Sequence, residues 1–518
     1  MSTDRNRHQA GELMPPEASA AAEWLRGVLA PGAGLSADSR AVSPGDAFFA
    51  FPGQASDGRR FVAQAVARGA GAVLFELDGA GPLEIGAVPA RGVSGLRQLA
   101  GPIAAEVLGR PSERMRVIAV TGTNGKTSTT QWVARGLAEL GGHCAVVGTL
   151  GCGVVGQLVD TGLTTPDALG LQSMLARFAA QGVGTVAMEA SSIGLEQGRL
   201  NGTNVEVAAF TNLTRDHLDY HRTMQAYALA KARLFGWPGL RVAVVNGDDP
   251  YSVQMLGALH PRVEPDGEAP FRIVYGLAPW QYGVRGDALL LAEHIQDDGG
   301  GTTMTLSGDF GKAQLRLQLI GRFNVSNALA VAGCWLAVGV EFDDVVRALQ
   351  SLVPVPGRLE TLERHNAPLV VVDYAHSPDA LANVLATLRP VAASRGGRLW
   401  CVFGAGGDRD AGKRPMMGLV AERGADRLVI TSDNPRSEAP FRIVSDIRAG
   451  LSREPAMTEL DRAVAIESAL RQAEPADVVL IAGKGHEDYQ EIAGVRHPFS
   501  DVEVAQRALA AREEAVGV

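Results

Sequence analysis

Residues 116–128 read RVIAVTGTNGKTS, an apolar run followed by a glycine-rich turn. The run predicts a strand buried on both faces of a parallel sheet. A helix beginning near Thr127 would direct its first N–H groups, with those of the turn, at a phosphate. Lys126 would neutralise the outer phosphates, and the Thr127 hydroxyl would bind Mg²⁺. Val120 stands where the strict phosphate-loop pattern needs a glycine, so an ordinary glycine-rich turn is the alternative.

The same order of buried strand and polar loop recurs further along the chain. VGTVAM runs into EASS at residues 183–192, VEVAAF into TNLTRDHLDYH at 205–221, and RVAVV into NGDDP at 241–250. In a parallel sheet the polar loops share the carboxyl edge of the strands, where such sheets bind ligands. We therefore expect one nucleotide site at this edge, and we expect ATP or GTP to occupy it.

A proline-rich joint, LVPVPGR at 352–358, precedes four more strand and loop pairs. An alanine-rich region with short apolar runs comes before the central part. The predicted fold class is α/β with three domains. Residues 1–113 would form a small mixed α/β domain, 114–353 a phosphate-loop domain with a parallel sheet, and 354–518 a Rossmann-like domain.

Composition excludes several classes of protein. The formal charge of −9 provides no basic field for nucleic acid. The first residues contain no signal-peptide core, and no run approaches the ~18 apolar residues that a membrane helix needs. The four cysteines lack paired spacing, which is typical of a reducing compartment. We expect a monomeric cytoplasmic enzyme with small-molecule substrates.

Candidate metal ligands follow two of the central strands. Glu189 follows one strand, and His217 lies with Asp216 in the loop after the next. Mg²⁺ prefers oxygen ligands and accepts an imidazole as a minority partner. Singly, each residue could be a hydrogen-bonded loop residue. Lys231 lies among apolar neighbours in AYALAKARLF and reads from its own pattern as a surface lysine with a buried stem.

The last domain carries a different set of loop charges. Arg409 and Arg436 could each form a planar fork for a carboxylate, and Glu487 could bind an amine. That combination suits an amino-acid substrate. Taken singly, these charges could equally be solvated surface groups.

Seven motifs occur in an order that resembles the Mur ligase family over almost the whole chain: TGTNGKTS, NLTRDHLDYH, AYALAKARLF, GRFNVSNALA, PGRLE, DYAHSPDAL and DNPR. These ligases build bacterial cell-wall precursors. The stretch SADSRAVSPGDAFFAFPGQASDGRRF and the DNPR tetrapeptide resemble the members that add meso-diaminopimelate to UDP-N-acetylmuramoyl-L-alanyl-D-glutamate. Lysine-adding relatives have a different tetrapeptide.

The resemblance implies roles for individual residues of this sequence. The implied UDP-muramoyl-dipeptide contacts are Ser39, Gln54, Ala55, Ser56, Thr164, Thr165, Ser191, Gln197 and Arg199. The implied ATP contacts are Gly122, Thr123, Asn124, Gly125, Lys126, Thr127, Asn327, Arg358 and Asp373. The implied diaminopimelate contacts are Arg409, Asp433, Asn434, Pro435, Arg436, Gly483 and Glu487.

The resemblance also implies the catalytic centre. Lys126, Glu189, His217 and Lys231 would be catalytic, with Thr127 as a further Mg²⁺ ligand. Lys231 would be carbamylated, so that its carbamate acts as a carboxylate toward the metal, which reverses its interpretation as a surface lysine.

Two positions depart from the family pattern. Ile193 stands where many relatives have His, and Ala405 where they have Cys. The alternatives are a lysine-adding or folylpolyglutamate-type ligase, a phosphate-loop kinase and a non-catalytic nucleotide switch.

Overall fold

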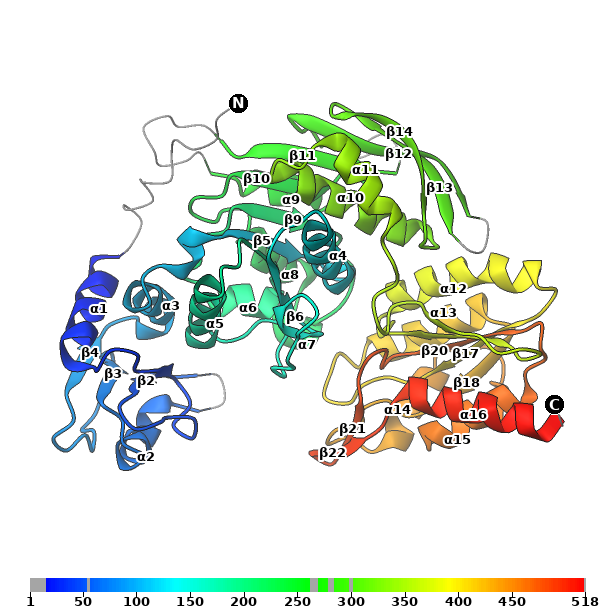
Figure 1. The fold of residues 1–518 in the computed structure, drawn as a ribbon. Coiled ribbons are helices and arrows are strands. Elements are labelled where there is room, and N and C mark those ends of the chain that lie inside the picture. The colour runs from blue at the N-terminus through cyan, green and yellow to red at the C-terminus, as the bar shows by residue number, and fades with distance from the viewer. Residues whose placement is uncertain (1–14, 54–55, 261–268, 278–283, 298–300, 517–518) are drawn as a thin grey trace.

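Three large sheets, with a separate two-stranded one, organise the computed structural model, which describes residues 15–53, 56–260, 269–277, 284–297 and 301–516 (Figure 1). The first sheet is parallel, in the order β1 (Leu35–Ser36), β2 (Ala47–Ala50), β3 (Ala72–Glu76) and β4 (Ala90–Val93). One face of this sheet packs on α1 (Pro16–Val28) and α3 (Leu96–Val107), and the other face packs on α2 (Val62–Ala67).

The central sheet is the largest, and its middle strands are parallel. Its order is β14 (Gly311–Leu317), β13 (Thr302–Gly308), β12 (Ala288–Asp297), β11 (Phe271–Gly276), β10 (Val242–Asn246), β9 (Val207–Phe210), β5 (Arg116–Thr121), β8 (Thr185–Glu189), β6 (Cys144–Gly148) and β7 (Gly151–Val154). Antiparallel pairing occurs only at its ends, where β12–β13–β14 and β6–β7 form hairpins, among the strands that the structure describes.

Both faces of this sheet are buried, which explains the near-continuous apolar runs of its strands. Along β5, Ile118 and Val120 face one core while Val117 and Ala119 face the other. Helices cover both faces. The first core contains side chains of α4 (Lys126–Glu139), α10 (Arg322–Ala337) and α11 (Phe342–Gln350). The second contains side chains of α5 (Ala168–Ala180), α8 (Met224–Ala232) and α9 (Ser252–Gly257).

The third sheet is drawn yellow to red in Figure 1 and is parallel except at one edge. Its order is β15 (Glu360–Leu362), β16 (Leu369–Asp373), β20 (Val478–Ala482), β17 (Leu399–Phe403), β18 (Arg427–Ile430) and β19 (Met457–Thr458). One face packs on α12 (Pro378–Ser394), α13 (Lys413–Gly424) and α14 (Pro440–Arg448). The other packs on α15 (Arg462–Gln472) and α16 (Asp501–Val516).

The predicted α/β class and the predicted strands are confirmed, and each predicted strand of the central and last domains is a member of the expected sheet. The hairpin β21 (Tyr489–Ile492) and β22 (Val495–Pro498) was not predicted, because its exposed residues show no apolar alternation. The domain boundaries stay predictions. No helix in the described parts of the chain is long and apolar enough to cross a membrane.

Helix α3 beside the first sheet contacts the turn at Asn201 of the central part, backbone against backbone. Gly101 of α3 lies so close to the carbonyl of Asn201 that a Cβ there would overlap it. We therefore expect Gly101→Ala to lower the free energy of unfolding by about 1–3 kcal/mol through overpacking. Gly27→Ala is the control, since a Cβ at this exposed position of α1 meets nothing within 4 Å. Urea unfolding of both variants checks the difference, and equal midpoints would contradict it.

Candidate active site

The glycine-rich turn 122–127 joins β5 to α4 and is shaped by main-chain contacts. Asn212 accepts hydrogen bonds from the N–H of Thr123 on its carbonyl (2.8 Å) and from the N–H of Asn124 on its side chain (2.9 Å). Gly125 has a φ of 86°, and a Cβ there would overlap the side-chain oxygen of Asn327. The turn therefore holds the N-terminus of α4 open to an anion, with Asn327 beside it.

Two lysines converge on a single carbonyl of this turn. The Nζ of Lys126 lies 3.0 Å from the carbonyl oxygen of Gly122, and the Nζ of Lys231 lies 2.6 Å from the same atom. Lys231 is 1% exposed, and its Nζ lies 4.4 Å from the centroid of the Tyr227 ring. Burial, and then the charge of Lys126, lower the pKa of Lys231 well below its usual value. The interpretation of Lys231 as a surface lysine is therefore wrong.

Glu189 ends β8 and is the centre of a hydrogen-bonded group. Its two carboxylate oxygens accept from the N–H (2.8 Å) and the hydroxyl (3.1 Å) of Thr149. The Thr149 hydroxyl also lies 3.0 Å from that of Thr164. Thr165 donates to the Glu189 carbonyl (2.8 Å) and lies 3.0 Å from the hydroxyl of Ser191. The end of β8 thus gathers three of the predicted dipeptide contacts.

Arg199 and Gln197 extend this group from the turn after α6 (Ser192–Glu196). Arg199 donates to the Thr165 carbonyl (2.7 Å) and, with two nitrogens, to the side-chain oxygen of Gln197 (2.9 and 2.7 Å). Burial lowers the pKa of Arg199 below its usual value. Five predicted contacts for the dipeptide substrate are therefore joined in one network, with a guanidinium among them.

His217 lies in the loop after β9, immediately before α7 (Leu218–His221), with a φ of 53°. Burial lowers its pKa to about 4, against the opposing charge of Asp216. Its side chain is 38% exposed, so solvent screens part of this effect. The imidazole is therefore neutral near pH 7 and keeps a lone pair that a metal could use.

Asp216 connects the central sheet to the last one. Its carboxylate lies 3.4 Å from the Nε2 of His376 and 3.4 Å from the Nζ of Lys413. Burial raises the pKa of Asp216, but the His376 hydrogen bond and the Lys413 charge outweigh it and hold that pKa well below its usual range. A second pair, Arg215 with Asp410 at 3.1 Å, lies beside it.

Arg358 also crosses from the last domain to the glycine-rich turn. Its guanidinium donates to the hydroxyl of Thr127 at 3.3 Å. Asp373 accepts from the N–H groups of Leu359 and Ala375, both at 2.8 Å, and burial raises its pKa. Asp373 therefore shapes the loop that carries Arg358, and the structure brings both near the predicted nucleotide site.

The loops after β17 and β18 bring the predicted amino-acid contacts together. A Cβ on Gly406 would lie 2.9 Å from a guanidinium nitrogen of Arg436 and 3.7 Å from Arg409, so both arginines flank this glycine. The Pro435 carbonyl packs on Gly407. At the end of β20, Gly483 has a φ of 122°, and a Cβ there would overlap the carboxylate of Asp433.

The β21–β22 hairpin holds Arg436 in its conformation. The N–H of Arg436 donates to the carbonyl of Glu491 (3.0 Å), and the N–H of Ala493 donates to the carbonyl of Arg436 (2.7 Å). These bonds stabilise the left-handed φ of 51°, which is unfavourable for arginine. One guanidinium nitrogen donates to Gly407 (2.7 Å), and the group's further N–H donors can serve a ligand carboxylate.

Ser39 and Ser56, two of the predicted uridine contacts, lie in loops that follow β1 and β2 of the first sheet. Ser39 is buried and donates to the side chain of Gln64 (2.8 Å), whereas Ser56 is exposed. Gln54 and Ala55 lie outside the described residues. Among the residues that are described, no hydrogen bond joins Ser39 or Ser56 to the network at the end of β8.

The predicted metal ligands are Thr127, Glu189, His217 and Lys231. Within the described residues, no group of three or more His, Cys, Asp or Glu side chains is placed to hold a metal. The donors offered are one hydroxyl, one carboxylate, one imidazole and one amine. Since Mg²⁺ prefers oxygen, this set fits it only if Lys231 carries an added carboxylate group, as the carbamate would provide.

Three residues at the site escaped the sequence prediction: Tyr227, Lys413 and Thr149. Tyr227 lies four residues before Lys231, so the helical period could have placed it on the same face. Lys413 follows β17 and Thr149 follows β6, and neither lies in a sequence motif that indicates a chemical role. Of the two departures from the family pattern, Ile193 lies in α6 and Ala405 is buried after β17.

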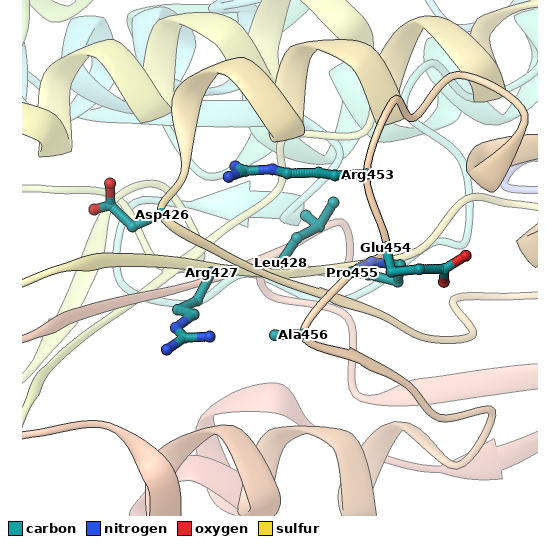
Figure 2. Close-up of a pocket in the computed structure, with 7 residues that line it drawn as sticks. All are labelled: Asp426, Arg427, Leu428, Arg453, Glu454, Pro455 and Ala456. Carbon is teal, nitrogen blue, oxygen red and sulfur yellow. The ribbon is translucent and has the colours of Figure 1, made fainter.

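A pocket of about 220 Å³ lies elsewhere on the last domain (Figure 2). Its lining includes Arg427 and Leu428 at the start of β18, and Pro455 and Ala456 just before β19. It therefore opens at the amino ends of these strands, whereas the loops described above follow their carboxyl ends. No predicted site residue lines it.

Three family profiles match this chain in sequence. Residues 33–105 match the Mur ligase family, catalytic domain, residues 120–335 the Mur ligase middle domain, and residues 357–485 the Mur ligase, glutamate ligase domain. These profiles define a class of ligases, and they follow the order of the three sheets.

Curated relatives match over nearly the whole chain. A protein of Acidovorax sp. (strain JS42), named UDP-N-acetylmuramoyl-L-alanyl-D-glutamate--2,6-diaminopimelate ligase, is 50% identical over 95% of this chain and 97% of its own. A Ralstonia nicotianae protein of the same name is 49% identical over 95% of each. A solved structure of a ligase with that name is 39% identical, with a TM-score of 0.64 over 93% of this chain and 95% of its own. The chain belongs to the Mur ligase family.

We expect the pKa of the His217 ring to lie far below that of an ordinary histidine. Burial lowers the pKa to about 4 while Asp216 raises it, so Asp216→Asn should lower the midpoint further. Nitrogen-15 NMR of histidine-labelled protein between pH 3.5 and 8 measures this titration midpoint. The signal of His217 is the one that is lost in the His217→Gln variant. A midpoint near 6.5 in the wild type, or an upward shift in Asp216→Asn, would contradict the assigned environment.

Proposed function

We propose that this chain is an ATP-dependent ligase that joins meso-2,6-diaminopimelate to the D-glutamate side-chain carboxylate of UDP-N-acetylmuramoyl-L-alanyl-D-glutamate. The names of relatives that are about 50% identical over most of the chain support this substrate pair. One structural observation carries the chemistry. The glycine-rich turn, the network at the end of β8, and Arg358 from the last domain meet at the carboxyl edge of the central sheet.

The proposed reaction begins at the turn. The D-glutamate carboxylate attacks the γ-phosphorus of ATP, the bond to the bridging oxygen breaks, and an acyl phosphate and ADP result. Lys126 and Arg358 stabilise the charge on the transferring phosphoryl group. Thr165, Ser191 and Arg199 hold the dipeptide so that its carboxylate faces the phosphate.

The amine completes the amide bond. The diaminopimelate amine, held by the loops after β17, β18 and β20, attacks the acyl carbonyl and gives up a proton, and inorganic phosphate leaves. Activation is needed because a free carboxylate is a poor acyl donor. Arg215–Asp410 and Asp216–Lys413 hold the two domains together around this step, which supports exclusion of water from the acyl phosphate.

We propose Mg²⁺ as the cofactor, held by Thr127, Glu189, His217 and carbamylated Lys231. Mg²⁺ would supply charge neutralisation for the phosphates. The lowered pKa of Lys231 supports the modification, because carbon dioxide reacts with the neutral amine and a proton leaves. The carbamate would also place an anion close to Lys126, whose Nζ contacts the same carbonyl oxygen as the Nζ of Lys231.

The remaining role assignments belong to the same proposal. Ser39 with residues 54–56 would hold the uridine nucleotide, Asn327 the adenine, and Arg436 the distal carboxylate of diaminopimelate. The functional domains would span 1–113, 114–353 and 354–518. We propose that the enzyme acts as a monomer in the cytoplasm.

The deciding measurement is phosphate release from ATP and Mg²⁺ with the UDP-muramoyl dipeptide. We expect turnover with meso-diaminopimelate and not without an amine, and a product heavier by one diaminopimelate residue in mass spectrometry. L-Lysine is the matched amine, since it lacks the distal carboxylate. A preference for lysine would move the assignment to the lysine-adding relatives. Release of phosphate without any amine would favour a kinase or simple ATPase.

Arg436→Lys tests the distal carboxylate contact. Lysine keeps the charge but loses the planar fork, so the loss of one charge-assisted bond of about 1.5–3 kcal/mol should raise the KM for diaminopimelate about 10- to 100-fold. The KM for ATP should not change. Arg442→Lys, on the exposed side of α14, is the control. A near-normal KM for diaminopimelate in Arg436→Lys would remove this role.

A further inference from the structure

Lys484 is a fully buried cation that the proposed reaction does not use. It follows Gly483 in the loop after β20, and its side chain has 0% exposure. Its Nζ lies 2.8 Å from the Oε2 of Glu487 and 3.2 Å from the side-chain oxygen of Asn434. A buried ammonium is stable only when partners of this kind compensate for lost hydration.

Asn434 contacts the same carboxylate oxygen from the other side. Its amide nitrogen donates to the Oε2 of Glu487 at 2.8 Å. Its amide oxygen accepts from Lys484 and, at 2.9 Å, from the N–H of Glu491 in the hairpin. Both ends of the Asn434 amide are therefore occupied within the protein, so this buried residue orients Glu487.

The hydrogen bonds from Lys484 and Asn434 both use the same carboxylate oxygen of Glu487. Oε2 accepts both hydrogen bonds, and among the described residues no hydrogen bond uses Oε1. The side chain of Glu487 is 16% exposed, so one edge of it reaches the surface of the loop cluster. A substrate ammonium would therefore meet one oxygen in a fixed orientation.

The negative charges around Glu487 explain why a lysine is needed beside it. Without Lys484, the carboxylate of Glu487 would be largely buried with Asp433 and Glu491 nearby on the same loops. Arg436 is directed toward Glu491, at 3.5 Å, and Arg462 is paired with Asp501 at 2.7 Å. Lys484 is the cation in direct contact with Glu487 among the described residues.

We propose that Lys484 is a positioning residue for the amino-acid substrate. By binding Oε2, it fixes the orientation of the Glu487 carboxylate and directs Oε1 at the substrate ammonium, with Asn434 as the second hydrogen-bond donor to Oε2. Lys484 itself does not touch the substrate. The inference rests on the proposed function, because Glu487 must bind the diaminopimelate amine for this orientation to matter.

A double-mutant cycle tests the proposal, with Lys484→Met, Glu487→Gln and the double variant. If Lys484 acts through Glu487, each single variant should raise the KM for diaminopimelate at least tenfold. The double variant should then lie within about twofold of Glu487→Gln, because the effects of residues that act as one unit do not add. The KM for ATP should stay near the wild-type value. Multiplying effects, or an unchanged KM in Lys484→Met, would overturn the proposal.

Thermal melting of the same variants supplies a readout that needs no substrate. Lys484→Met leaves a buried carboxylate unpaired and should melt lower than the wild type, whereas adding Glu487→Gln should restore part of the loss. If Lys484→Met does not fold, this recovery in the double variant still tests the pairing, and its absence would overturn it. Lys312→Met, at an exposed position on β14, controls for the lost charge. A wild type inactive with diaminopimelate would instead refute the proposed function.

Discussion

The parallel pairing of β9, β5 and β8 is the constraint on which the site depends. In this register Val120 lies opposite Glu189, and Thr121 lies opposite Phe210. The three strands therefore end at one level, and their following loops emerge side by side. This common level brings the glycine-rich turn, the carboxylate of Glu189 and the loop that contains His217 to one place. Parallel strands with helical crossovers place such loops at one edge in general, but the register decides which side chains face each other.

Charge burial is the second organising feature. Lys126 and Lys231 share one carbonyl, and Arg358 reaches the adjacent Thr127 from another domain. Placing three basic side chains so close together, one of them fully buried, is unfavourable unless anions compensate. Asp216 compensates for part of this charge, and a polyphosphate would compensate for more. Burial, and then the charge of Lys126, lower the pKa of Lys231, which links the environment of the turn to the proposed modification.

The position of the polar loops at the sheet edge could be predicted from the sequence, because the change from apolar to polar residues marks where a strand ends. An apolar run followed by TGTNGKTS or by TNLTRDH places its polar residues at a sheet edge without any coordinates. Lys231 could not be placed this way. Its neighbours in α8 are apolar and alanine-rich, and only the packing of that helix against the glycine-rich turn makes its side chain buried rather than exposed. The resemblance to a family, rather than any periodicity, indicated its role.

The β21–β22 hairpin, near the C-terminus, is a second feature that could not be predicted from the sequence. None of its strand residues is buried and they show no apolar alternation, so the sequence does not predict it, yet it holds Asn434 and Arg436 through backbone and side-chain hydrogen bonds. Sequence by itself determined the α/β class, the succession of the main strands along the chain and the loops that carry chemistry, because these follow from local hydrophobic patterning. Only the tertiary structure decided which charges are buried, which carboxylate oxygen each cation contacts, and how the last domain meets the glycine-rich turn. Those outcomes depend on contacts between residues far apart in the chain, which no local pattern encodes.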